Sequence, residues 1–179
     1  TTKLIKKMEN STSVKSVAYP FGIALALYSI LYLVLIYVFN ISETNWIVGL
    51  ISKIIEISIF IFALITFKKK NGNIISLKQA LKVGLGVAVI GGLIAAVYIF
   101  IHYTYIYPEY LQKMYDTQVL AMSEQGLTAE QMEGSMTWLE YISSPWVYSA
   151  MAILGNLIFG FIISLLTGLI IRNDQKQAY

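Results

Sequence analysis

The chain contains no cysteine and only one histidine among its 179 residues, and charged residues make up just 13% of it. The missing cysteines exclude disulfides and thiolate metal sites, and one histidine offers little to an imidazole-bound metal. A soluble domain is about 25% charged and about 45–50% apolar, whereas 57% of this chain is hydrophobic. These values exclude a soluble globular domain. They also exclude a disordered chain, which is poor in apolar residues.

What the sequence has instead is four apolar runs, each long enough for a membrane-spanning helix of about 20 residues. They cover residues 17–39, 46–67, 81–107 and 146–171. We expect the first run to be an uncleaved span, because it is longer than the apolar core of a signal peptide and no small-residue cleavage motif follows it. The pattern predicts an all-α fold, a four-helix membrane bundle forming a single membrane domain over residues 1–179.

Lysine and arginine lie almost entirely on one side of the predicted membrane. Of the 13, Lys53 is inside a run, only Lys113 flanks the runs on the other side, and the remaining 11 lie on the first side. Such a bias marks the cytoplasmic side, so both termini are predicted to be cytoplasmic. Contacts with anionic lipid headgroups are expected from the connection that carries Lys68, Lys69, Lys70, Lys78 and Lys82. Nucleic acid is a poor alternative partner, because the lysines border the spans rather than form a basic domain.

The segment 108–145, between the third and fourth runs, is predicted to form an external hairpin of two amphipathic helices. Apolar residues recur at helical spacing in its first half, and Gly126 is placed to end that helix. Thr128 with Gln131 three residues later is a capping box that opens the second helix. Six carboxylates against one lysine give the segment a net charge of −5. A helical hairpin of this size is able to dock a partner.

Small residues recur at every fourth position of the third and fourth runs, which lets helix backbones approach closely within a membrane. The third run carries Gly84, Ala88, Gly92 and Ala96, and the fourth carries Gly160, Ser164 and Gly168. We predict that these two stripes face each other, antiparallel, within one chain. The alternative is that one stripe forms the seam of a homo-oligomer.

Polar residues inside the apolar runs are the candidates for a functional site, because the bilayer makes them costly. Lys53 and Glu56 are three residues apart, so they share a helix face and are expected to pair. Counting at about 1.5 Å per residue places polar residues of all four runs near one depth: Ser29, Glu56, Tyr98 and Asn156. This layer is either a site for an ion, a proton or a polar substrate, or a buried network that sets helix register.

Motifs for catalysis are missing from the sequence, which contains no zinc-protease, nucleophile-elbow or phosphate-loop pattern. His102 lies among tyrosines near the end of the third run, and these tyrosines are typical of an interfacial aromatic belt. A lone histidine in such a belt is expected to be a hydrogen-bonded anchor. We therefore assign no catalytic, cofactor-binding or metal-binding residue and expect a non-enzymatic role without cofactors.

Residues 67–84 read FKKKNGNIISLKQALKVG, and the long third run and the acidic segment follow them. In these features the chain resembles domain of unknown function 4199, a family of four-span membrane proteins of Bacteroidota. The family has no established activity, so the resemblance implies no site residue. It implies a bacterial inner membrane, which would make segment 108–145 periplasmic, and a family 2 glycosyltransferase as a neighbouring partner.

Three functions stay open at this level. The favoured one is a non-enzymatic accessory or scaffold subunit of an inner-membrane complex, such as one that handles lipid-linked sugars. It is favoured because the chain is small, has no catalytic motif and carries a hairpin suited to docking. The main alternative is a small oligomeric carrier or channel that uses the polar layer around Glu56. A membrane enzyme with Glu56 or the hairpin carboxylates as acids is the third.

Overall fold

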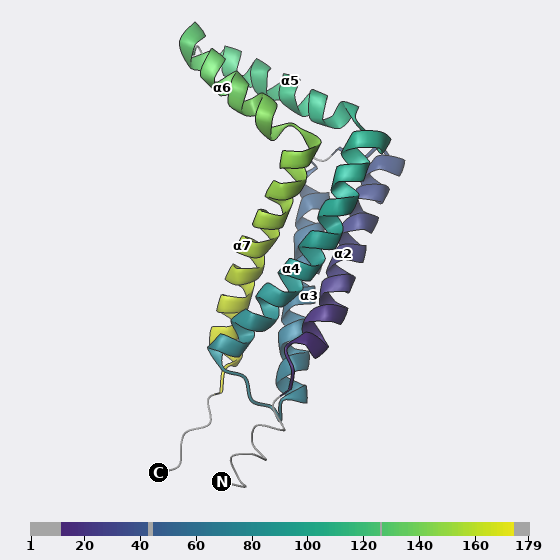
Figure 1. Ribbon diagram of the computed structural model, residues 1–179, viewed down its shortest axis with the longest axis vertical. Helices are drawn as coiled ribbons and strands as arrows, with labels where there is room; N and C mark the ends of the chain where they lie inside the picture. Colours follow the sequence, from purple (N-terminus) through teal and green to yellow (C-terminus); the bar gives the residue numbers. More distant parts are fainter. Residues whose placement is uncertain (1–11, 43–44, 126, 174–179) are drawn as a thin grey trace.

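The computed structural model describes residues 12–42, 45–125 and 127–173, with only the backbone described at residues 129 and 132. In the described part the chain forms, in order, α2 (Lys15–Val38), α3 (Trp46–Lys70), α4 (Leu77–Ile101), the π-helix η1 (His102–Ile106), α5 (Glu109–Glu124), α6 (Ala129–Ile142) and α7 (Pro145–Ile171). Figure 1 shows α2, α3, α4 and α7 running side by side, with α5 and α6 at one end of the bundle.

Four helical stretches are long enough and apolar enough to cross a membrane: α2, α3, α7, and α4 together with η1. The prediction of an all-α membrane protein with four spans is therefore confirmed. The third span begins at Leu77, earlier than its apolar run, because Ser76 and Gln79 form a capping box there. At its other end the span changes from α-helix to π-helix at His102, which the apolar pattern does not predict.

The two ends of the bundle are packed differently. We call the end that contains Lys70 and Lys78 the lysine end, and the end that carries α5 and α6 the hairpin end. Fully buried residues of the core gather toward the lysine end, where Phe60 and Phe67 of α3 meet Val83 and Val87 of α4. This half of the bundle is a close-packed core, and the polar groups described below lie in the other half.

The seam between α4 and α7 is made by the small residues of both helices. A Cβ atom added to Gly84 would overlap the Ser164 hydroxyl, and one added to Gly160 would lie 2.9 Å from the Ala88 Cβ. The two stripes thus face each other, antiparallel, within one chain. Gly168 continues the seam, with the Ala80 Cβ at 2.8 Å. At the hairpin end the contact is looser: a Cβ on Gly92 would meet Asn156 at 3.5 Å, and Ala96 borders an apolar crevice that includes Trp146.

A second close seam, between α2 and α4, was not predicted. A Cβ atom on Gly22 of α2 would lie 2.7 Å from the Ile90 Cβ, and one on Gly91 of α4 would lie 2.8 Å from Leu25. The central helix α4 therefore packs tightly on two sides, against α7 and against α2. Helix α3 packs less closely against each of its neighbours, which leaves room between α3 and α7.

The lysine end is held together by hydrogen bonds between segments far apart in sequence. The Asn173 side chain accepts from the Ile75 backbone N–H at 3.1 Å and donates to the Asn73 carbonyl at 2.7 Å. Lys68 donates to the carbonyl of Ile171 at 2.8 Å, so it caps the end of α7. Lys68, one of the five lysines expected to contact headgroups, thus also holds the end of α7. The other four are exposed: Lys69, Lys70, Lys78 and Lys82.

The segment between the third and fourth spans forms two helices, as the pattern predicts. The capping box of Thr128 and Gln131 opens α6, while Gly126 lies outside the described residues. Leu111 of α5 and Leu139 of α6 are buried near the bundle. From this base the hairpin extends sideways past α7 rather than covering the end of the bundle (Figure 1).

Candidate functional site

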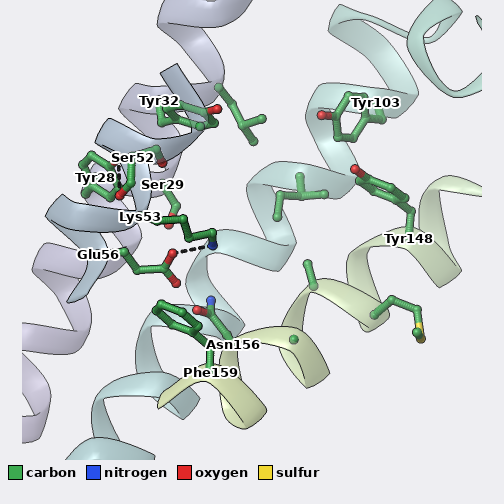
Figure 2. A pocket seen from close by; sticks show the side chains of 16 residues that line it. Tyr28, Ser29, Tyr32, Ser52, Lys53, Glu56, Tyr103, Tyr148, Asn156 and Phe159 are labelled. Carbon is green, nitrogen blue, oxygen red and sulfur yellow. Dashed lines mark hydrogen bonds and ion pairs between the residues drawn. The ribbon is translucent and has the colours of Figure 1, made fainter. Parts of the chain in front are cut away.

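A cavity of about 610 Å³ lies in the hairpin half of the bundle and contains most of the predicted polar layer. Its walls come from all four spans, with α3 and α7 on opposite sides (Figure 2). Toward the lysine end it stops at Phe159, whose ring packs edge-on against the fully buried Phe60 at 6.2 Å. The small-residue seam and the core continue beyond these two rings. The cavity is therefore a recess with a closed floor.

The charged pair Lys53 and Glu56 is the main electrostatic feature of the cavity. Lys53 Nζ lies 2.6 Å from Glu56 Oε2 and 4.8 Å from the centroid of the Phe159 ring. The Lys53 side chain is 59% exposed, while that of Glu56 is only 12% exposed. Figure 2 shows both side chains reaching from α3 toward Asn156 and Phe159 of α7. The Glu56 carboxylate is thus largely buried in the bundle, and the Lys53 side chain lies on its more exposed side.

Two hydroxyl groups on the α2 side are engaged in local hydrogen bonds. The Tyr28 hydroxyl lies 2.8 Å from Ser52 Oγ and 3.1 Å from the Ser52 carbonyl, and it joins α2 to α3. Ser29 Oγ donates to the Leu25 carbonyl at 2.9 Å, a bond within its own helix. These hydroxyl groups stabilise the wall of the cavity. The charged groups, Lys53 and Glu56, are the ones we expect to interact with a ligand.

Four of the five residues predicted for the polar layer do line this cavity: Ser29, Lys53, Glu56 and Asn156. Tyr98 does not line it. Its ring lies instead beside that of His102, with centroids 5.6 Å apart. Depth counting said nothing of the direction in which Tyr98 faces around α4. Tyr98 is therefore not part of the cavity wall.

Two tyrosines that the sequence analysis did not assign to the layer line the cavity in place of Tyr98. Tyr103 comes from η1 and Tyr148 from α7, and their rings meet edge-on at 5.2 Å. The π-helix turns Tyr103 inward, leaving it only 2% exposed, so it is not part of an interfacial belt. π-helical segments are frequent at functional sites, and a sequence gives little warning of them.

His102 lies outside the cavity and is packed among aromatic rings. It is 1% exposed and contacts Tyr37 and Tyr103 edge-on, at 5.7 Å and 5.0 Å between centroids. Within the described residues its Nδ1 atom has no hydrogen-bond partner. We expected hydrogen bonds to hold His102 in place, but Nδ1 makes none to the described residues. The imidazole is held by packing against the aromatic rings.

The polar groups of the cavity are suited to binding a ligand. The described residues include no group of three or more histidine, cysteine or acidic side chains able to hold a metal ion. The Lys53–Glu56 pair offers one ammonium and one carboxylate, and Asn156 adds an amide with both donors and an acceptor. Such a set recognises a small polar or charged group inside an apolar surround.

Comparison with known proteins identifies a family and nothing more specific. The model of the family described as "Protein of unknown function (DUF4199)" matches residues 20–173. Neither the curated proteins nor the solved structures contain a significant match. Since the matched residues include most of α2 and the whole of the other three spans, the hairpin and the cavity, the chain belongs to the DUF4199 family of proteins of unknown function.

Proposed function

We propose that the protein is a non-enzymatic accessory subunit of a membrane complex and that the α5–α6 hairpin is its docking element. The observation that carries this proposal is the sideways reach of the hairpin, which leaves much of its surface without a partner in the chain (Figure 1). Trp138 and Tyr141 of α6 are 62% and 59% exposed, and Leu120 of α5 is 61% exposed. Exposed aromatic side chains of this kind are typical anchors of protein interfaces.

The negative charge of the hairpin indicates what kind of partner surface it would bind. Its carboxylates outnumber its single lysine, Lys113, and Glu124, Glu130 and Glu133 are exposed. An acidic surface with aromatic anchors is complementary to a basic surface that has an apolar pocket. A family 2 glycosyltransferase, and with it a complex that handles lipid-linked sugars, is the first partner to test.

The proposed location is the bacterial inner membrane, with both termini in the cytoplasm and residues 108–145 in the periplasm. The support is the lysine bias across the spans. Because the chain has no cysteine, single cysteines can report the side directly. We expect a membrane-impermeant maleimide to label Ser123→Cys in intact cells, and to label Lys78→Cys only after lysis. The reverse pattern would overturn the proposed orientation.

The docking role predicts that a partner copurifies through the hairpin. After purification in mild detergent, mass spectrometry should find one partner in a fixed ratio to the tagged protein. The double variant Trp138→Ala/Tyr141→Ala should lower its recovery by at least about tenfold, because buried aromatic anchors contribute about 2 kcal/mol or more each. The control is Trp46→Ala, which changes a residue of α3 that is 74% exposed but lies outside the hairpin. Equal recovery from both variants would contradict the docking role.

A second function is favoured by the cavity, namely a small oligomeric carrier or channel that uses the polar groups around Glu56. The closed floor at Phe159 and Phe60 counts against a continuous path in one chain, so this function requires a second arrangement or further copies. Recovery of the chain alone, or only with copies of itself, would favour it over the docking role. Liposome flux measured with Glu56→Gln would then be the next experiment.

A further inference from the structure

The position of Lys53 is unusual for a lysine within a membrane span. It lies seven residues after Trp46, about 10 Å along α3, yet its side chain is 59% exposed. An ammonium group at this depth must meet water, a counter-charge or another hydrogen-bond acceptor. It carries three N–H donors, and the hydrogen bond to Glu56 uses one of them. The ammonium therefore keeps two donors for a further acceptor that enters the cavity beside the Glu56 carboxylate.

Two glycines of the cavity wall leave this space open. A Cβ atom added to Gly49 of α3, or to Gly155 of α7, would have no other group of the chain within 4 Å. Gly84 and Gly160 differ in this respect, because a Cβ atom at either position would clash with a neighbouring helix. Glycine in a helix costs about 1 kcal/mol relative to alanine, and no close approach explains it at these two positions. Their effect is to widen the cavity.

The opening of the cavity lies on the side of the bundle. Helix α7 packs chiefly against α4 and only lightly against α3, and the cavity lies between α3 and α7 (Figure 2). On its rim Met151 is 52% exposed, and Gly155 and Lys53 are exposed as well. These residues lie within the spans, so the opening faces the acyl chains of the bilayer.

We propose that this cavity binds the phosphate headgroup of a membrane phospholipid, which enters from the bilayer between α3 and α7. The phosphate accepts from the Lys53 ammonium, the Asn156 amide offers a further donor, and the acyl chains lie against the apolar rim. A phospholipid is favoured over a soluble anion because the opening lies within the spans and its rim is apolar. This binding site is independent of the docking role of the hairpin.

Cavity-filling variants test the proposal. Gly155→Leu places a side chain in the cavity, where a Cβ atom meets no other group within 4 Å, and Gly134→Leu is its matched control, since a Cβ atom on Gly134 of α6 also meets open space. A second variant, Lys53→Met/Glu56→Gln, removes the ammonium without leaving an unpaired carboxylate. Native mass spectrometry of the delipidated protein in detergent measures binding of phosphatidylglycerol. Thermal unfolding of each variant shows that it is folded.

We expect the double variant to weaken binding of the most tightly held phosphatidylglycerol by about tenfold, because a hydrogen bond to a charged group contributes at least that factor. Gly155→Leu should weaken it by a similar factor, because the leucine side chain occupies part of the space that the headgroup needs. Gly134→Leu should bind like the wild type. Diacylglycerol, which lacks the phosphate, should not bind, and glycerol phosphate should not displace the lipid. Three results would overturn the proposal: unchanged binding in Gly155→Leu, equal binding of diacylglycerol, or displacement by glycerol phosphate, which would indicate a site for soluble anions.

Discussion

Replacing Gly84 with leucine is expected to destabilise the monomer by about 3 kcal/mol or more, the upper part of the range for overpacked cores. The Cβ atom alone would overlap the Ser164 hydroxyl, and the Gly160 carbonyl lies 3.3 Å from the same point. Because backbone and side chains of α7 block this position, α4 and α7 would have to separate. The free energy of unfolding in mixed micelles, followed by tryptophan fluorescence, measures the effect.

Two further variants make this prediction specific to the seam. Gly84→Ala should be destabilised, and Gly84→Ala/Ser164→Gly should recover most of the loss, because the second change removes the group that is overlapped. Gly155→Ala is the control, since its Cβ meets open space, and it should be neutral or slightly stabilised by helix propensity. If Gly84→Leu only dissociated an oligomer and left the monomer intact, the intrachain seam would be wrong.

The second large effect is expected from Lys53→Met, which should lower the free energy of unfolding by about 3 kcal/mol. The variant leaves the carboxylate of Glu56, whose side chain is 12% exposed, without its cation. Breaking a buried ion pair by removing one partner costs about 3–5 kcal/mol. We expect the lower end of this range, because Lys53 itself is 59% exposed.

A double-mutant cycle separates this pairing from other roles of Lys53. Glu56→Gln keeps the shape and removes the charge, so Lys53→Met/Glu56→Gln should recover most of the stability that Lys53→Met loses. Ser58→Ala is a suitable control on the same helix, because Ser58 Oγ donates to the Ile54 carbonyl of its own helix. Additive losses in the double variant would show that the two side chains do not depend on each other.

Features set by local sequence were predicted well. The apolar runs found all four spans, and the capping box of Thr128 and Gln131 located the start of α6. The pairing of Lys53 with Glu56 follows from spacing on one helix. Each of these depends on residues within one or two helical turns, which a sequence displays directly.

Features that depend on the direction in which a helix face points were predicted only in part. Ser29, Glu56 and Asn156 line the cavity together with Tyr103, whereas Tyr98 packs beside His102 instead. The π-helix that starts at His102 rotates the chain beyond that point, and the apolar pattern of the run continues unchanged through it. The hydrogen bond from Lys68 to the Ile171 carbonyl, 103 residues away, was likewise not predicted.

The sequence by itself determined that this protein is a four-span helical membrane protein with an acidic helical hairpin, because apolar length, charge bias and capping residues act locally. Only the tertiary structure showed that glycines in similar helical contexts have different roles, some at close helix contacts and others at an open cavity. Gly84 and Gly160 let helices touch, while Gly49 and Gly155 leave a cavity open beside Lys53. The difference lies in what stands opposite each glycine, and that is set by the packing of distant helices.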